Sequence, residues 1–152
     1  MSTSLTQLIT DEHVVLGARP QSWQDAIRLA AAPLVASASV TDHYIDRMIE
    51  VVQAYGPYIV LAPGVALAHA QPDGSVTRTA MSAMTVPEGI SFGHDGNDPV
   101  RLVLCLAAAD STSHLEALKA FVQIMRDPDA VDRLVLATNP QGFRTLLEPT
   151  PL

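Results

Sequence analysis

The chain has 152 residues, a net charge of −7, 48% hydrophobic residues and only 16% charged residues. These proportions exclude a disordered chain, and the acidic balance argues against a nucleic-acid-binding surface, which is normally basic. No apolar run approaches the roughly 18 residues of a membrane-spanning helix, and no secretory signal is visible. The single cysteine, Cys105, excludes an internal disulfide, and its place in an apolar run predicts a buried, inert thiol. We therefore expect one cytoplasmic domain over residues 1–148, with a tail at 149–152.

The N-terminal part of the sequence predicts two helices and one strand. A short helix is expected at residues 4–9, and a strand rich in β-branched residues at 13–16. Ser22 is a typical N-cap residue, and Asp25 follows it near the positive end of the helix that it opens. Pro33 falls inside the apolar stripe of this helix, so we expect a kink or an early end there.

The middle of the chain predicts one amphipathic helix and three strands. Thr41 is the expected cap of the helix, and Gly56 before a proline is its expected end, because glycine suits a left-handed C-cap. Short β-rich or alternating runs predict strands at residues 58–62 and 78–86. The run at 100–107 is almost wholly apolar, which is typical of a strand covered on both faces.

The C-terminal third of the sequence predicts three helices. Ser113 and Glu116 have the spacing of a capping box, which places the start of a helix at Ser113. An Asp-Pro pair at 127–128 and an Asn-Pro pair at 139–140 each predict a cap followed by a proline in the first helical position. Strands interleaved with helices, one strand being covered on both faces, predict an α/β layered domain.

The first candidate for chemistry is His69. In residues 56–72 a predicted strand runs into a Pro-Gly turn, and a segment of small residues then leads to this histidine. Ala66, Ala68 and Ala70 put little bulk around the imidazole, so we expect a dry docking surface that a large partner can approach. A neutral imidazole offers a nucleophilic nitrogen near neutral pH. The alternative is a structural histidine at a strand end, bonded to a backbone carbonyl.

The second candidate is His114. If Ser113 caps the helix, His114 is its first residue, beside free N–H groups and the positive end of the helix dipole. That field favours a neutral ring, and such a helix end is a ready site for phosphate. A hydrogen bond from His114 would then steady a phosphoryl group held by another residue. The alternative is an exposed histidine with no function.

Other sites for chemistry find little support in the sequence. His94 lies in a turn-rich loop at residues 91–99, while His13 and His43 are isolated. No HxxxH or CxxC pair indicates a metal site. Walker, GxGxxG and GxSxG patterns are absent from the sequence, so we expect no nucleotide cofactor and no serine nucleophile.

The run from Tyr55 to Ala70, YGPYIVLAPGVALAHA, resembles the surroundings of the phosphorylated histidine in a known family. The family is enzyme IIA of the bacterial phosphoenolpyruvate-dependent sugar phosphotransferase system, in its mannitol/fructose superfamily, and the resemblance is strongest to the ascorbate-type branch. Further matches follow in chain order, at residues 44–45, 87–93, 98–100, 107–110 and 114–118. The resemblance therefore extends over nearly the whole chain.

This resemblance implies a phosphoryl carrier. His69 would accept the phosphoryl group from phospho-HPr, with Nε2 facing the partner, and pass it to a cysteine of enzyme IIB (EIIB). His114 would be the second active-site histidine, and the membrane enzyme IIC (EIIC) would move the sugar. The implied fold is a single three-layer α/β domain, with a mixed sheet flanked by helices on both faces. No cofactor, metal or nucleic acid is implied, and the apolar composition permits a homodimer.

The sequence departs from the family pattern at two places. Relatives usually have proline before the active histidine, where this chain has Ala68, and mannitol-type relatives carry an arginine near Val51 or Val52. Arg47 lies one turn earlier, and we do not assign that role to it. Two alternatives also remain. One is a regulatory IIA read by a transcription regulator. The other is a small-molecule-binding α/β module in which His69 is structural.

Overall fold

A mixed β-sheet of five strands runs through the middle of the computed structural model, which describes residues 5–148. The strand order is β1-β4-β5-β3-β2, with parallel pairs β1/β4 and β3/β5 and antiparallel pairs β4/β5 and β2/β3. The strands are β1 (Val14–Val15), β2 (Val60–Ala62), β3 (Val65–His69), β4 (Ala80–Ile90) and β5 (Val100–Ala107). The expected tail at 149–152 lies outside the described residues.

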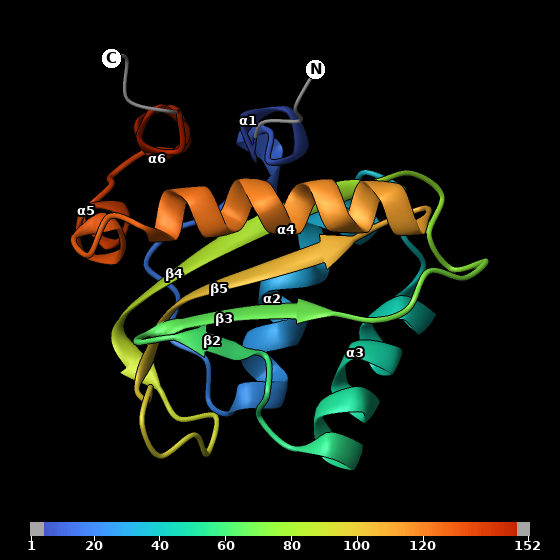
Figure 1. The fold of residues 1–152 in the computed structure, drawn as a ribbon, viewed down its shortest axis with the longest axis horizontal. Coiled ribbons are helices and arrows are strands. Elements are labelled where there is room, and N and C mark those ends of the chain that lie inside the picture. The colour runs from blue at the N-terminus through green and yellow to red at the C-terminus, as the bar shows by residue number, and fades with distance from the viewer. Residues whose placement is uncertain (1–4, 149–152) are drawn as a thin grey trace.

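Helices cover both faces of this sheet (Figure 1). The elements other than strands are α1 (Leu5–Leu8), the 3-10 helix η1 (Asp11–His13), α2 (Trp23–Ala36), α3 (Asp42–Tyr55), α4 (Ser111–Met125), α5 (Ala130–Val135) and α6 (Pro140–Leu146). Helices α2 and α3 pack on one face, and α1, α4, α5 and α6 on the other. The predicted three-layer α/β architecture with a mixed sheet is therefore confirmed. Between residues 5 and 148, no helix is long and apolar enough to cross a membrane.

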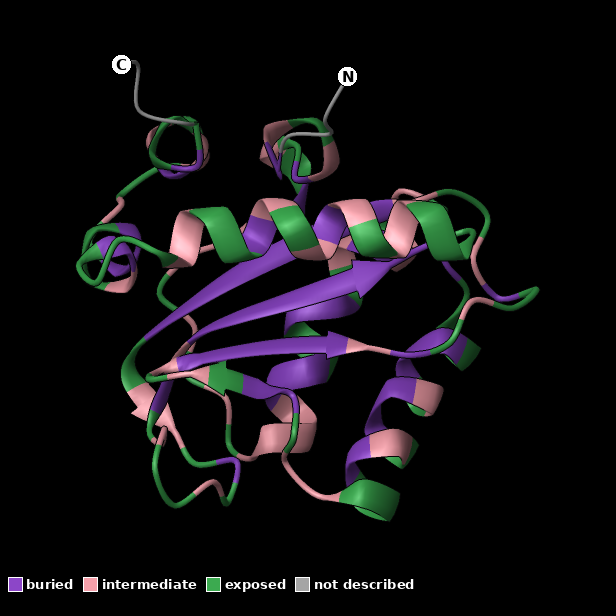
Figure 2. Ribbon diagram, in the orientation of Figure 1, coloured by how far each residue is buried: buried purple, intermediate pink, exposed green. Residues whose placement is uncertain are grey.

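The central strands separate two apolar cores, and they are buried almost throughout (Figure 2). Along β5, Val103 and Cys105 enter the core beneath α2 and α3, while Leu102 and Leu104 enter the core beneath α4. Successive side chains of a strand point to opposite faces, so a run of apolar residues is needed when both faces are covered. The predictions of a doubly covered strand and of a buried Cys105 are confirmed.

Strand β3 is an element that the sequence did not predict as a strand. Alanine has a low β propensity, and three of the six residues from 65 to 70 are alanine. The strand exists because it pairs with β5 over its whole length, from Val65 opposite Leu102 to His69 opposite Leu106. The strand predicted at 58–62 is correspondingly shorter, beginning only at Val60.

Helix α2 continues through Pro33 to Ala36, so the expected early end is wrong. A proline inside a helix removes one hydrogen bond to the carbonyl four residues earlier. Here that carbonyl belongs to Leu29, whose side chain is 40% exposed, on the side of the helix where water can satisfy it. The Ser22 cap is confirmed, because its hydroxyl accepts a hydrogen bond from the Asp25 N–H at 3.1 Å.

Strand β4 runs four residues further than predicted, through Pro87 to Ile90. Its register with β5 shifts between Thr85 and Ile90, and β1 pairs with it only at Ala83 and Met84. Pro87 therefore lies where the ladder requires no N–H donor, and proline is tolerated at such a place.

The helix predicted at Pro128 instead begins at Ala130. The carboxylate of Asp127 accepts a hydrogen bond from the Asp129 N–H at 2.9 Å and also pairs with Arg133, so it closes a turn before the helix. The prediction from the Asn-Pro pair at 139–140 is confirmed. The Asn139 side chain accepts a hydrogen bond from the Gly142 N–H at 2.6 Å, and Pro140 is the first residue of α6.

Candidate functional site

His69 is the last residue of β3, and its imidazole is half-buried. The Nδ1 atom lies 2.9 Å from the carbonyl oxygen of Leu67 in the same strand. A carbonyl only accepts hydrogen bonds, so Nδ1 carries the proton in this contact. In the neutral ring the lone pair is then on Nε2, which is the nitrogen available as a nucleophile.

His114 is the fourth residue of α4 and not its first, so the predicted capping box is wrong. The N-cap is Asp110, whose carboxylate accepts a hydrogen bond from the Ser113 N–H at 2.7 Å and has a lowered pKa because of its hydrogen bonds with Ser113. The sequence contained this signal, because aspartate caps helices as well as serine does. The N–H of His114 donates to the Asp110 carbonyl at 3.1 Å.

With Asp110 as the N-cap, a negative charge lies at the N-terminal end of α4. A carboxylate already occupies the position where free N–H groups were expected to receive phosphate, so the open anion site predicted at Ser113 is not present. The imidazole of His114 nevertheless reaches the candidate site, because helical side chains tilt toward the N-terminus of their helix. Its ring and that of His69 meet edge to face, with centroids 5.4 Å apart and planes inclined at 76°.

The electrostatics of this pair favour a neutral His114. Burial lowers the pKa of His114, and the charge of a protonated His69 lowers it further. Because an ordinary histidine has a pKa of about 6.5, a lowered pKa leaves the His114 ring uncharged at neutral pH. A neutral imidazole donates one hydrogen bond and accepts another. The structure thus brings together both histidines that the sequence singled out.

Tyr58 is a further aromatic residue at the site, to which the sequence analysis gave no role. Its ring contacts that of His69 edge to face, with centroids 5.9 Å apart and planes inclined at 86°. Partial burial raises the pKa of Tyr58, and nearby Tyr55 adds to the effect. The His69 imidazole therefore has ring neighbours from two elements, α4 and the segment before β2.

The three alanines around His69 do not form a docking surface, and this expectation is wrong. Ala66, Ala68 and Ala70 are at most 4% exposed and belong to the core beneath α2 and α3. Residues two apart in a strand share a face, so the alanines point away from the face that His69 uses. Exposed apolar side chains occur instead at Tyr58, whose ring contacts that of His69, at Leu61 in β2 and at Leu115, which follows His114.

Arg47 holds the chain that follows His69. Its guanidinium donates to the carbonyl of Gln71 at 2.7 Å and forms an ion pair with Asp73 at 3.0 Å. Ser75 lowers the pKa of the same Asp73 carboxyl by donating hydrogen bonds to it. Arg47 is thus engaged with the loop that follows β3.

The three remaining histidines have other surroundings. His13, isolated in sequence, is buried, with Nδ1 donating to the Met81 carbonyl at 3.0 Å and Nε2 at 2.9 Å from the Ser37 hydroxyl. His94 is half-buried in its loop, where Nδ1 accepts a hydrogen bond from the Asn97 N–H at 3.0 Å. His43 is exposed on α3.

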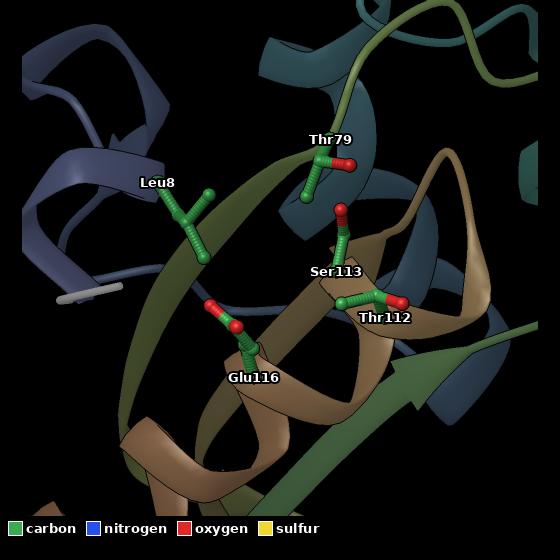
Figure 3. Close-up of a pocket in the computed structure, with 5 residues that line it drawn as sticks. All are labelled: Leu8, Thr79, Thr112, Ser113 and Glu116. Carbon is green, nitrogen blue, oxygen red and sulfur yellow. The ribbon is translucent and has the colours of Figure 1, made fainter. Parts of the chain in front are cut away.

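A pocket of about 270 Å³ opens beside the start of α4 (Figure 3). It is lined by Leu8, Thr79, Thr112, Ser113 and Glu116, so neither His69 nor His114 contributes to it. The Thr79 hydroxyl is engaged as the acceptor of the Ala109 N–H at 2.9 Å. Over residues 5–148 the structure has no group of three or more His, Cys, Asp or Glu side chains that could hold a metal ion.

Residues 7–149 match the family described as "Phosphoenolpyruvate-dependent sugar phosphotransferase system, EIIA 2". The chain belongs to this family and is a phosphotransferase-system component. Its predicted membership is therefore confirmed.

Three similar proteins have names from the same system. The chain is 32% identical over 144 residues, 94% of either sequence, to the "Ascorbate-specific PTS system EIIA component" of Escherichia coli (strain K12). It superposes on PtxA of Streptococcus mutans, described as a PTS IIA, with a TM-score of 0.87 and 31% identity over 95% of this chain and 93% of that one. An Escherichia coli mannitol IIA, solved in complex with phosphorylated IIB, gives a TM-score of 0.79 and 25% identity over 92% and 98%.

Proposed function

We propose that the protein carries a phosphoryl group on Nε2 of His69, taking it from phospho-HPr and giving it to a cysteine of a partner EIIB. The observation that carries this proposal is the 2.9 Å hydrogen bond from Nδ1 to the Leu67 carbonyl. It selects one nitrogen of the ring as the nucleophile. The family membership of the chain supports the same role.

The fixed tautomer also explains how the group is passed on. The Nε2 lone pair attacks phosphorus, and an N–P bond forms as the bond to HPr breaks and leaves its electron pair on HPr. The proton on Nδ1 remains hydrogen-bonded to the Leu67 carbonyl, so the phosphorylated ring carries a positive charge. The neutral imidazole is therefore a good leaving group when the N–P bond breaks. A cysteine thiolate of EIIB then attacks phosphorus, the N–P bond breaks, and the lone pair returns to Nε2. Positioning and charge stabilisation account for most of the catalysis in such transfers.

His114 assists this transfer without accepting the phosphoryl group. Its ring lies edge to face with His69, with centroids 5.4 Å apart, and is half-buried. A neutral imidazole in that place can donate a hydrogen bond to a phosphoryl oxygen on Nε2. We expect this hydrogen bond to contribute most in the transition state, where charge on the phosphoryl oxygens is redistributed. In this partly buried site it is also stronger than the same bond in water.

HPr and EIIB use the same face of the protein in turn, because one imidazole serves both. The related mannitol IIA was solved with a phosphorylated IIB, which supports an EIIB as the acceptor here. The exposed apolar side chains of Tyr58, which contacts His69, and of Leu115, which follows His114, suit a small, transient interface. The membrane EIIC takes part only indirectly, after EIIB.

The names of the relatives support an ascorbate-type or pentitol-like uptake system. Several ascorbate-specific EIIA components share 31–32% identity with this chain over 94% of its length. The Val51 and Val52 positions lack the arginine expected of the mannitol type, which agrees with that choice. The purified protein, charged with phosphate, should therefore donate faster to an ascorbate-type EIIB than to a mannitol-type EIIB.

Intact mass spectrometry tests the carrier role directly. Incubation with phosphoenolpyruvate, enzyme I and HPr should add one acid-labile phosphoryl group to the wild-type protein. His69→Ala should add none while remaining folded, because the side chain is half-buried and at a strand end. His43→Ala, which removes an exposed histidine of α3, is the matched control and should behave as wild type. Phosphorylation of His69→Ala would refute the assignment.

A further inference from the structure

Tyr44 lies in the first turn of α3, is fully buried, and places its hydroxyl where β3 and β5 end. The hydroxyl donates to the Leu106 carbonyl at 2.8 Å and accepts a hydrogen bond from the Ala70 N–H at 3.1 Å. The Ala70 carbonyl, 3.2 Å away, is within reach as a second acceptor. The helical spacing of the apolar residues in 42–55 indicates a buried Tyr44, and residues 44–45 are among the matches to the family, but neither observation gives the hydroxyl a role.

The partners of this hydroxyl belong to the two strands that lead to the candidate site. Ala70 follows His69 directly, and Leu106 is the residue paired with His69 in the parallel ladder. One residue beyond Leu106, β5 ends and the chain turns into α4, which carries His114. In Figure 1 the start of α3 lies beside the end of β3, in agreement with these contacts. One side chain therefore joins the two backbone segments from which both imidazoles are presented.

We propose that Tyr44 is a positioning residue that sets the separation of His69 and His114, a role that rests on the function proposed for these histidines. Without the hydroxyl, the Ala70 N–H and the Leu106 carbonyl would be buried groups lacking this partner. Such groups are costly, so the strand ends would move apart or admit water. Transfer depends steeply on geometry, and a displacement of about 1 Å can cost roughly a hundredfold in rate.

The surroundings of Tyr44 suit a permanent hydrogen-bonding role. Burial raises the pKa of its hydroxyl to about 12, which is only partly opposed by the hydrogen bond with Ala70. The phenol consequently stays protonated over the whole range in which a histidine can be phosphorylated. Its ring is part of the core beneath α3, so phenylalanine at this position keeps the packing and removes only the hydroxyl.

The test compares Tyr44→Phe with Thr85→Val. Thr85 is 1% exposed, and its hydroxyl accepts a hydrogen bond from the Gly17 N–H at 2.9 Å, toward the other end of the sheet. Each substitution thus removes one buried hydroxyl that is bonded to backbone. Urea denaturation of both variants establishes the loss of stability for each, so that effects on the site are judged at known stability.

Two measurements report on the site itself. The first is the rate of phosphorylation by phospho-HPr, and the second is the ¹⁵N titration of the imidazoles in the unphosphorylated protein. For Tyr44→Phe we expect a rate about tenfold lower. We also expect the His114 titration midpoint to rise toward the value of an ordinary histidine, because contact with His69 loosens. Thr85→Val should keep the wild-type rate and midpoint.

Wild-type rate and unchanged imidazole spectra for Tyr44→Phe would overturn the proposal. If this variant does not fold, p-aminophenylalanine at position 44 replaces it, since an aniline donates to Leu106 but accepts poorly from Ala70. Transfer that is slower by about two- to fivefold, together with a raised His114 titration midpoint, supports the proposal. Wild-type rate and midpoint for this variant refute it. Failure of the wild-type protein to accept phosphate from HPr would instead refute the proposed function, while the titrations would still report the positioning.

Discussion

Replacement of His114 tests most directly whether His69 accepts the phosphoryl group while His114 only donates a hydrogen bond to it. His114→Ala removes a half-buried imidazole whose ring centroid lies 5.4 Å from that of His69. A hydrogen bond to a charged group is worth about 1.5–3 kcal/mol, and about 1.4 kcal/mol corresponds to a factor of ten in rate. Transfer should therefore slow by roughly one to two orders of magnitude.

The fold should survive this change. Alanine is the best helix former, and the N-cap of α4 is Asp110, which the substitution leaves intact. Rapid-quench measurements should show that His114→Ala is still phosphorylated on His69, with slow handover to EIIB. His114→Gln, which keeps a donor, should recover part of the rate. The exposed His43→Ala is again the control.

Three results would contradict the reasoning. Wild-type rates for His114→Ala in both directions would show that this ring makes no contact with the phosphoryl group. Phosphate on His114 in the His69→Ala variant would show that it is an acceptor and not an assistant. Equal losses for the Ala and Gln variants would indicate that shape, and not the donor, is what matters.

Two further predictions concern the buried polar groups of the central strands. Cys105 should resist thiol reagents in the native protein and react only on unfolding, because burial raises the pKa of its thiol to about 12; rapid native labelling would contradict this. Ser82 faces Cys105 across the β4/β5 ladder, and an interaction of its hydroxyl with that thiol partly opposes the rise of the thiol pKa. Within residues 5–148 this buried hydroxyl has no hydrogen bond of regular geometry. Ser82→Ala should leave the free energy of unfolding unchanged or raise it by about 1 kcal/mol, measured by urea denaturation, whereas a loss of that size would reveal a partner for the hydroxyl.

Some features of the site could be predicted from the sequence because they depend on short spacings. The small-residue run before His69 and the strand-helix junction before His114 indicated both histidines, and the apolar run of β5 indicated a central strand. The cap of α4 was misplaced by three residues because Asp110 and Ser113 are both good caps. Spacing alone does not decide between two overlapping cap signals.

Other features depended on contacts between distant parts of the chain. The helical period of α3 indicates that Tyr44 is buried, but it carries no information on the hydrogen bonds of the hydroxyl with Ala70, 26 residues later. Strand β3 has too many alanines for its local sequence to indicate a strand, and its pairing with β5 decides the matter. The alanines were likewise assigned to the wrong face, since the face of a residue follows only once the strand itself is known.

The hydrogen bond from His69 to Leu67 has a consequence for how this site tolerates sequence change. Its acceptor is a main-chain carbonyl, so no single substitution removes it, as mutation of an aspartate would remove a carboxylate acceptor. A carbonyl also does not titrate, so acidification cannot neutralise it. Under the proposed function, the acceptor that fixes the tautomer of His69 is therefore lost neither by substitution nor by acidification, although acid still protonates Nε2 itself. Under the proposed function, exposed side chains around this histidine can therefore be changed while the acceptor of the Nδ1 proton stays the same.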